Sequence, residues 1–291
     1  MLVETNTLTG MKQDKETGGM AIQNNQASKP RANDKKTNRR KPLSRSATRR
    51  KPKTASPKST EQNPGQSINS TDPKLMRRQA GIWNNLMDRY FRLEFDGFEN
   101  LPDEPCLLIG VHSGGPLTMD AWTVVMAWWR EFEETRALHG TAHDVLMNAP
   151  VLGDYFRRLG VISPTKENIR AAFDKGDDVI LWPGGEVDCY RSWMNRDKAV
   201  LGGRKGFIRL AMSAGVPIVP VATVGGHDTL FVLSEGRGLA KKLKLKERMR
   251  SDVAPITLSW PFGVALHLTP FQHVPLPAKI RTRLMEPIYL D

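Results

Sequence analysis

The 291-residue sequence has only two cysteines and no apolar run long enough to cross a membrane. Cys106 and Cys189 provide neither a disulfide framework nor the spacing of a metal site, so we expect no metal and a reducing environment. The longest apolar run, residues 121–129 with one threonine, is far shorter than the roughly 20 residues of a membrane span. The first 19 residues lack a basic segment followed by an apolar one, which argues against a secretory signal peptide. These absences predict a cytoplasmic protein that does not cross a bilayer.

The first 72 residues contain no aromatic residue and very few isoleucines or valines. Residues 1–58 hold fifteen Lys and Arg against four Asp and Glu, which accounts for nearly all of the net charge of +12. Such a segment cannot bury enough apolar surface to offset the entropy lost on ordering. We therefore predict a disordered basic tail over residues 1–72, followed by one nearly neutral domain over residues 73–291.

A basic tail is compatible with binding to nucleic acid or to an anionic membrane. Because this tail has no aromatic side chains on which bases can stack, we predict no specific nucleic-acid partner. A non-catalytic protein that binds anionic surfaces through the tail is one alternative to an enzyme. The sequence leaves the oligomeric state open.

Two further segments combine basic and apolar residues. Residues 73–92, which begin after a helix cap at Asp72, place apolar residues at helical spacing with four arginines between them. This composition fits an interfacial membrane anchor as well as an ordinary helix packed on the domain. Six Lys and Arg over residues 241–250 precede an apolar stretch over residues 260–271 that could enter lipid headgroups. We therefore expect peripheral association with a membrane surface.

Between these segments, apolar strand patterns alternate with helical ones. We predict strands over residues 106–111, 137–142, 179–182 and 217–224, and helices over residues 120–132, 150–159, 165–175 and 204–214. Continuous apolar strands separated by helices are typical of a parallel sheet covered on both faces. The predicted fold class is a single α/β domain with a mostly parallel central sheet.

Three short blocks carry the chemistry. They are Val-His-Ser-Gly-Gly at residues 111–115, Trp-Pro-Gly-Gly-Glu at residues 182–186 and Val-Pro-Ile-Val-Pro-Val at residues 216–221. The first two follow predicted strands, and sites in open α/β sheets gather at the carboxyl ends of strands. His112 therefore lies where a general base can meet two glycine turns, which indicates an acyl-transfer site.

These blocks resemble those of the glycerolipid acyltransferase superfamily over roughly residues 80–291. The branch that it resembles most acts on monoacylglycerol and diacylglycerol, because Gly184 stands where other branches have glutamate. The resemblance implies that His112 deprotonates an acceptor hydroxyl for attack on an acyl thioester. The family has four residues between this histidine and an aspartate, whereas here seven residues lie between His112 and the first aspartate, Asp120. The family's second-motif arginine is missing near residues 159–163.

The resemblance implies an acyltransferase that uses acyl-CoA, or acyl carrier protein, as its donor and a glycerolipid as its acceptor, with no further cofactor. The acceptors considered are a lysophospholipid, lysophosphatidate, monoacylglycerol and diacylglycerol, and the missing arginine and glutamate favour an uncharged one. Asp120 is the first choice, and Glu186 the second, for steadying the histidinium. The predicted catalytic residues are His112 and Asp120, and the predicted substrate-binding residues are Ser113, Gly114, Gly115, Ser163, Lys166, Pro183, Gly184, Gly185, Glu186, Arg204 and Lys205.

Within this set, backbone amides of Gly114, Gly115 or Gly185 are expected to hold the oxyanion. Arg204 and Lys205, which open a predicted helix, are candidates for binding phosphates of CoA or lipid. A serine esterase using Ser113 is the second alternative, although this serine lacks the glycine two residues earlier that a nucleophile elbow requires.

Overall fold

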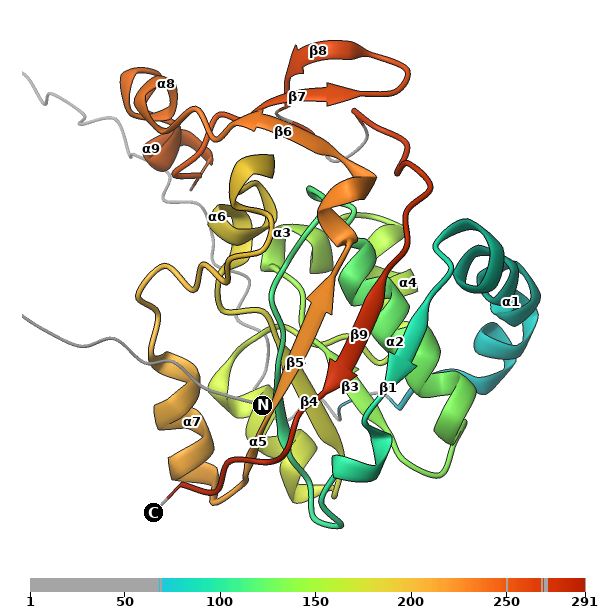
Figure 1. The fold of residues 1–291 in the computed structure, drawn as a ribbon. Coiled ribbons are helices and arrows are strands. Elements are labelled where there is room, and N and C mark those ends of the chain that lie inside the picture. Colours follow the sequence, from blue (N-terminus) through green and yellow to red (C-terminus); the bar gives the residue numbers. More distant parts are fainter. Residues whose placement is uncertain (1–67, 69, 250, 268, 270–271, 291) are drawn as a thin grey trace, which may run out of the picture. The chain divides into compact units, whose positions relative to one another are not determined.

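The computed structural model describes residues 68, 70–249, 251–267, 269 and 272–290 (Figure 1). Most of the predicted tail, residues 1–67 and 69, lies outside the described residues. The end of that stretch packs on the domain, because Ile68 is buried in the core and the Asp72 amide donates to the Arg158 carbonyl at 2.8 Å. The folded part therefore includes a few residues before 73.

The elements in chain order are helix α1 (Pro73–Asn85), a π-helical turn (Leu86–Tyr90), β1 (Glu94–Asp96), a 3₁₀ turn (Phe98–Asn100), β2 (Leu107–Ile109), α2 (Met119–Phe132), β3 (Leu138–Gly140), α3 (Asp144–Met147), α4 (Leu152–Arg158), α5 (Lys166–Asp174), β4 (Asp178–Leu181), α6 (Gly185–Cys189), a 3₁₀ turn (Trp193–Asn195), α7 (Gly206–Ala214), β5 (Ile218–Val224), a 3₁₀ turn (Gly226–Thr229), β6 (Phe231–Ser234), α8 (Arg237–Lys242), α9 (Leu245–Met249), β7 (Ile256–Ser259), β8 (Gly263–Leu266) and β9 (Arg281–Leu284).

The main sheet has the strand order β1-β9-β5-β2-β4-β3. Strands β5, β2, β4 and β3 are parallel neighbours, with Leu107 opposite both Val179 and Ile218, as the alternation of strands and helices predicts. Strands β1 and β9, which the sequence patterns did not predict, extend the sheet beyond β5. Strand β9 runs antiparallel to β5 and parallel to β1. The sheet is thus mostly parallel, and the predicted fold class is confirmed.

Alternating side chains of β2 point to opposite faces of the sheet, and each face is covered by different helices. On one face Leu107 and Ile109 lie in a core cluster with Phe173 of α5 and Ala211 of α7. On the other face Leu108 packs in a cluster with Trp128 of α2. Each fully buried leucine contributes about 1.5–3 kcal/mol to folding relative to an exposed one. These two layers hold β2, and the loop that follows it, in a fixed position.

Helix caps account for the boundaries of the covering helices. The Thr165 hydroxyl accepts a hydrogen bond from the Asn168 amide at 3.2 Å, which begins α5 one residue after the cap. Gly215 ends α7 with a φ of 68°, a left-handed conformation that favours glycine. Helix α7 begins at Gly206 rather than at residue 204, so Arg204 and Lys205 lie just before it.

The segment predicted as a possible membrane anchor packs most of its apolar side on the domain. Met76, Met87 and Phe91 are buried, and the Trp83 ring stacks on Trp122 of α2 with centroids 5.2 Å apart. Ile82 remains 68% exposed. This packing favours the ordinary-helix interpretation for most of residues 73–92. No helix among the described residues combines the length and hydropathy that a membrane crossing requires.

A second, three-stranded sheet follows β5 in the chain. Its strands are antiparallel in the order β6-β7-β8, with Leu258 opposite Phe231 on one side and Val264 on the other. In Figure 1 this sheet lies beyond the end of β5 at which the strand's arrowhead points, next to α6. The second sheet therefore lies at the carboxyl edge of the parallel strands.

Candidate active site

The three sequence blocks lie on three adjacent strands. The loop that contains His112 follows β2, residues 182–186 follow β4 on one side of it, and residues 216–221 overlap β5 on the other side. The carboxyl ends of parallel neighbours meet at one edge of a sheet. The fold therefore brings the first two blocks together although they start 71 positions apart in the chain.

The His112 side chain is held by one carboxylate and one ring. Its Nδ1 lies 3.1 Å from Oδ2 of Asp120, which is buried in the first turn of α2. Its ring stacks on Trp182 with centroids 5.0 Å apart and an interplanar angle of 1°. A hydrogen bond from Nδ1 to the carboxylate leaves the Nε2 lone pair free, and no group of the described residues bonds to it. His112 retains 18% side-chain exposure, so this nitrogen is accessible to a substrate hydroxyl.

The Asp120 carboxylate also fixes the backbone of the loop. Its second oxygen, Oδ1, accepts a hydrogen bond from the Ser113 amide at 3.0 Å. Seven residues separate Asp120 from His112, and the turn through Gly114 and Gly115, with φ of 74° and 77°, returns the chain so that the two side chains meet. The longer spacing is therefore compatible with a histidine–carboxylate pair.

A buried ion pair forms hydrogen bonds with both the main-chain amide and the main-chain carbonyl of His112. The His112 amide donates to Oδ2 of Asp188 at 2.6 Å, and the His112 carbonyl accepts from Nη1 of Arg191 at 2.8 Å. Asp188 and Arg191 also pair with each other and are fully or almost fully buried. Burial raises the pKa of the Asp188 carboxyl, while the Arg191 guanidinium acts in the opposite direction. The pair sets the position of the residue whose side chain faces Trp182.

The three glycine amides expected to hold an oxyanion are already used within the protein. Gly114 donates to Nδ1 of His227 at 3.3 Å, Gly115 to the Cys189 carbonyl at 3.1 Å, and Gly185 to the Trp182 carbonyl at 3.2 Å. The tight turns that bring the glycines together thus also satisfy these donors, so each amide would have to exchange its acceptor in order to bind an oxyanion. Among the described residues, the Gly184 amide has no such acceptor.

Ser113 is buried, with 2% exposure, and its hydroxyl has no hydrogen-bond partner among the described residues. A Cβ placed on Gly226 would lie 1.9 Å from Ser113 Oγ, so this glycine makes room for the serine. A small pocket of about 40 Å³ borders Ser113, Arg191 and His227. The serine therefore faces the protein interior and does not bond to His112, as a nucleophile activated by that base would.

Arg204 contacts the turn that follows β4. Its guanidinium donates to the Pro183 carbonyl at 2.8 Å and lies 3.5 Å from the Glu186 carboxylate. A Cβ on Gly185 would lie 2.6 Å from Nη1 of Arg204, so the second glycine of the turn admits the guanidinium. Arg204 and Glu186 thus brace the turn, and Lys205, exposed beside them, keeps its charge free.

Ser163 and Lys166 lie further along the same sheet edge. The chain just before Ser163 bridges to Thr141 beyond the end of β3, two strands away from β2. Ser163 is buried, with its carbonyl accepting from the Thr165 amide, and Lys166 is the first residue of α5. No hydrogen bond or ion pair among the described residues joins either side chain to His112.

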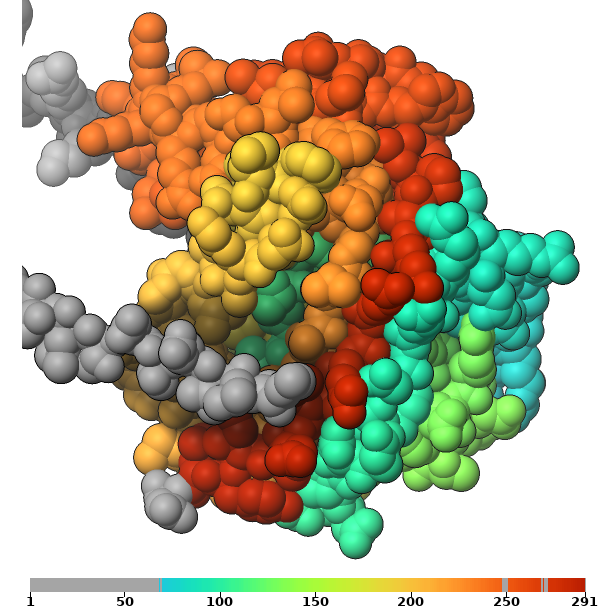
Figure 2. All heavy atoms as spheres, viewed as in Figure 1, coloured from blue at the N-terminus to red at the C-terminus, as the bar shows by residue number. Residues whose placement is uncertain are grey.

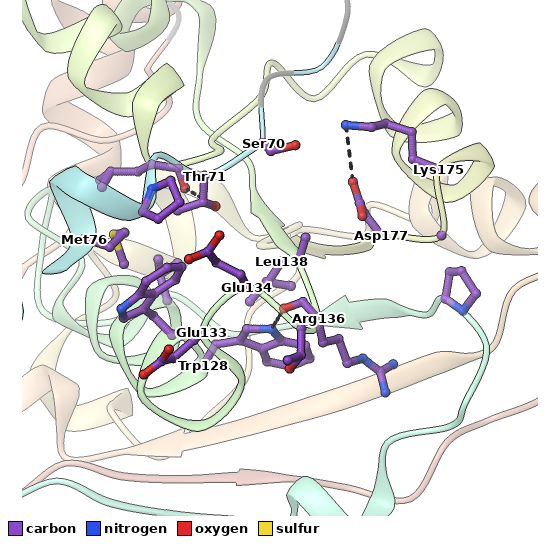
Figure 3. Close-up of a pocket in the computed structure, with 18 of the residues that line it drawn as sticks. Ser70, Thr71, Met76, Trp128, Glu133, Glu134, Arg136, Leu138, Lys175 and Asp177 are labelled. Carbon is purple, nitrogen blue, oxygen red and sulfur yellow. Dashed lines mark hydrogen bonds and ion pairs between the residues drawn. The ribbon is translucent and has the colours of Figure 1, made fainter.

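A pocket lies at the opposite edge of the sheet (Figure 3). It has a volume of about 700 Å³ and lies between the end of α2 and the starts of β3 and β4, where Trp128, Arg136 and Asp177 border it. None of the residues predicted from the sequence to form the site lines this pocket. The His112 site is therefore identified by its side-chain geometry and not by cavity size.

The profile of a family described as diacylglycerol acyltransferase matches residues 66–291, which is most of the chain. This chain belongs to the diacylglycerol acyltransferase family. The match includes the His112 loop, the turn after β4 and strand β5.

Individual relatives have low sequence identity to this chain. A Mycobacterium tuberculosis protein of uncharacterised function is 27% identical over 199 residues, covering 68% of this chain and 52% of the relative. A Gallus gallus protein named "DGAT1/2-independent enzyme synthesizing storage lipids" is 29% identical over 212 residues, covering 71% of this chain and 56% of the relative. The chain thus spans about half the length of these curated relatives. The crystal structure of the 1-acyl-sn-glycerophosphate acyltransferase PlsC from Thermotoga maritima aligns with 75% of this chain and 68% of its own, with a TM-score of 0.45 and 16% identity.

Sequence reasoning missed four side chains around the candidate site. Trp182 was noted only as part of a motif, and Asp188, Arg191 and His227 were not considered. Trp182 had a usable signal, because it directly precedes the Pro-Gly-Gly turn at a strand end. The ion pair of Asp188 and Arg191 had no usable sequence signal, because an Asp and an Arg three residues apart are typical of an exposed helix face.

Replacing Trp182 with leucine is expected to lower kcat of acyl transfer about tenfold, because the imidazole loses the ring that fixes its plane. Asp120 still holds Nδ1, so activity is reduced and not abolished. Trp182→Phe keeps an aromatic face and serves as the matched control, with kcat close to that of the unmodified protein. Equal kcat for the leucine and phenylalanine variants would show that the stack does not orient His112.

His227 predicts acid sensitivity of the fold. Burial, reinforced by the nearby Arg191 and Arg196, lowers the pKa of His227 to about 3. The unfolded chain, with a histidine pKa near 6.5, therefore binds more protons as pH falls below 6.5, and the folded state loses stability in that range. Between pH 7 and pH 4 this residue alone lowers the free energy of unfolding by about 3 kcal/mol.

Urea unfolding of the His227→Asn variant at both pH values checks this expectation. Asparagine still offers an acceptor to the Gly114 amide but does not titrate. The variant should lose less stability than the unmodified protein on acidification, by about the amount stated. An identical pH dependence of the two proteins would exclude His227 as a source of the acid sensitivity.

Proposed function

We propose that this chain transfers a fatty acyl group from a thioester donor, acyl-CoA or acyl carrier protein, to a hydroxyl of a glycerolipid. The single observation that carries the proposal is the His112 geometry: Nδ1 on buried Asp120, the ring on Trp182 and Nε2 unpartnered. Membership of the diacylglycerol acyltransferase family supports the substrate class.

In the proposed mechanism, the acceptor hydroxyl gives its proton to Nε2 of His112 as its oxygen attacks the thioester carbonyl. Asp120, 3.1 Å from Nδ1, stabilises the imidazolium that forms. The backbone donor that we propose for the developing oxyanion is an amide of Gly114, Gly115 or Gly185, which exchanges its present acceptor for the oxyanion. Collapse of the tetrahedral intermediate releases the thiolate, which takes the proton from Nε2. No acyl-enzyme forms: Ser113 lacks a base, and burial raises the pKa of the Cys189 thiol.

We favour an uncharged acceptor, monoacylglycerol or diacylglycerol, over lysophosphatidate or another lysophospholipid. Arg204, the cation nearest the turn after β4, already donates to the Pro183 carbonyl and pairs with Glu186. Its charge is therefore partly neutralised before any phosphate arrives. We also propose that the protein works on the cytoplasmic surface of a membrane, where such acceptors reside.

A panel assay tests the reaction and the acceptor together. The purified full chain is incubated with labelled acyl-CoA and, separately, glycerol 3-phosphate, lysophosphatidate, lysophospholipids, monoacylglycerol and diacylglycerol, and the products are identified by mass. We expect diacylglycerol or triacylglycerol as the main product. A phosphorylated product as the main species would contradict the proposed acceptor, and no acylated lipid from any member of the panel would contradict the proposed function.

The same assay separates acyl transfer from a serine esterase. Ser113→Ala should retain acyl transfer, and a fluorophosphonate probe should not label the protein, because Ser113 is buried and unactivated. Loss of activity in Ser113→Ala together with labelling of Ser113 would establish the esterase instead.

A further inference from the structure

The second sheet has an apolar side that the protein leaves uncovered. In the paired strands, Leu258 of β7 lies beside Val264 of β8, and Trp260 and Phe262 continue the same alternation through the connecting turn. These four side chains, which we call the outer apolar face, are between 44% and 65% exposed. Isolated exposed apolar residues are ordinary, but four on one face of a small sheet indicate a binding surface.

The opposite side of this sheet is buried and mixes apolar and polar side chains. Thr257 is fully buried opposite Val232 of β6, which is also fully buried, and the Thr257 hydroxyl lies 3.1 Å from Nδ1 of His267. Ser259 donates to the Gln272 carbonyl at 3.0 Å. A sheet with one face in water normally places polar residues on that face. The outer apolar face departs from this pattern, as a surface that faces an apolar medium does.

Lysines lie at the end of the second sheet away from the β7–β8 turn (Figure 1). Helices α8 and α9 pack on the second sheet through a cluster that joins Ala240 and Leu245 to Leu266 of β8. The two helices and the residues between them carry four exposed lysines, Lys241, Lys242, Lys244 and Lys246. Among the described residues, only Lys246 of these four pairs with an acidic group, Asp252. Figure 2 shows this part of the chain, coloured orange to red, as one continuous surface region.

The surface lies at the edge of the main sheet that holds His112. Strand β6 follows β5 through the turn Gly226–Thr229, and the Trp193 ring, which follows α6, lies 5.7 Å from the Phe231 ring of β6. Gly226 itself contacts the His112 loop, since a Cβ placed on it would lie 1.9 Å from Ser113 Oγ. A partner bound to the second sheet therefore lies at the same edge of the main sheet as His112.

We propose that the outer apolar face and the lysines of α8 and α9 form a docking surface for an anionic lipid membrane. Aromatic side chains at a sheet tip suit the headgroup region of a bilayer, and lysines at the other end of the same sheet complement anionic headgroups. The inference rests on the proposed function in one respect: a lipid acceptor has to reach the site from a bilayer. The predicted apolar stretch over residues 260–271 thus acts through Trp260 and Phe262; Leu268 and Phe271 lie outside the described residues.

The test is sedimentation of the full chain with vesicles of equal parts phosphatidylcholine and phosphatidylglycerol. Salt at about 0.5 M shortens the Debye length to about 4 Å, which suppresses binding by the basic residues alone. The double variant Trp260→Ser, Phe262→Ser should bind at least about tenfold more weakly at this salt concentration. Met212→Ser, which removes an exposed side chain of α7, is the control and should bind as the unmodified protein does. Equal binding of the double variant and the control would overturn the proposal.

Two further measurements separate other outcomes. Ile82→Ser removes the exposed apolar residue of α1, and a loss confined to this variant would assign docking to α1 instead. Light scattering detects a dimer, and a dimer that is lost in the double variant would show that the occupant is a second copy of the chain.

The vesicles contain no acceptor, so binding of the protein to them does not depend on turnover. Acyl transfer to a short-chain acceptor dispersed in detergent should survive in the double variant. If the unmodified protein binds vesicles but lacks this activity, the proposed function is contradicted while the proposed docking surface is still supported.

Discussion

Replacing His112 with alanine should lower the rate of acyl transfer about 10²- to 10⁴-fold, the range by which a positioned general base accelerates proton transfer. The imidazole is the group that offers Nε2 to the substrate, and Asp120 holds it through Nδ1 at 3.1 Å. The measurement is kcat with labelled acyl-CoA and diacylglycerol. His112→Gln is the second variant, because glutamine can still donate to Asp120 but has no titratable nitrogen.

The loss in His112→Ala must be separated from unfolding. Asp188 and Arg191 bond to the main chain of residue 112, so the alanine variant keeps both clamps. We therefore expect circular dichroism and the urea midpoint to change little. His139→Gln is a matched control: His139 is also buried and paired with a carboxylate, Asp177, but it lies on β3 away from the site. Comparable loss of kcat in His139→Gln would show that the activity reports stability and not the base.

Replacing Arg191 with methionine should destabilise the fold by about 3–5 kcal/mol, because it leaves the buried Asp188 carboxylate without its cation. The His112 carbonyl loses a donor in the same step, so acyl transfer should fall as well. Urea unfolding measures the free energy, and kcat is measured at a temperature where the variant is folded. Arg191→Lys keeps the charge without the planar pair of donors. Its free energy of unfolding and its kcat should lie between those of Arg191→Met and those of the unmodified protein.

The control for this prediction is Arg77→Met. Arg77 pairs with Glu134, but both side chains are more than half exposed, so the loss should stay within about 1 kcal/mol. A destabilisation by Arg191→Met no larger than that of Arg77→Met would show that the buried pair does not hold the site.

Much of the fold could be predicted because local patterns and the sheet agree. Residues 106–111 are apolar throughout, as a strand covered on both faces requires. Thr165 provides the cap that begins α5, and Gly215 the cap that ends α7. The second sheet escaped prediction because its exposed residues Leu258 and Val264 are apolar. Strands are predicted from the alternation of buried apolar and exposed polar residues, and strands with apolar residues on their exposed side lack this alternation.

The site could be predicted in part. His112 stood out because it follows a buried strand and precedes two glycines, and the turn through those glycines explains how Asp120 reaches it from eight positions away. The sequence could not show that the amides of the glycine turns already have acceptors, because a sequence does not reveal which amides a turn satisfies. The Asp188 and Arg191 clamp depends on two strands being neighbours, which only the tertiary structure provides.

The measurement that tests the central claim most directly is a single-turnover experiment with excess protein. Labelled acyl-CoA is bound first, diacylglycerol is added, and samples are denatured at successive times to follow the label. Direct attack assisted by His112 predicts that the label passes from CoA to lipid, that the protein stays unlabelled at every time, and that His112→Ala transfers the label at a greatly reduced rate. Label found covalently on a peptide containing Ser113 or Cys189, or unchanged transfer in His112→Ala, would contradict the account.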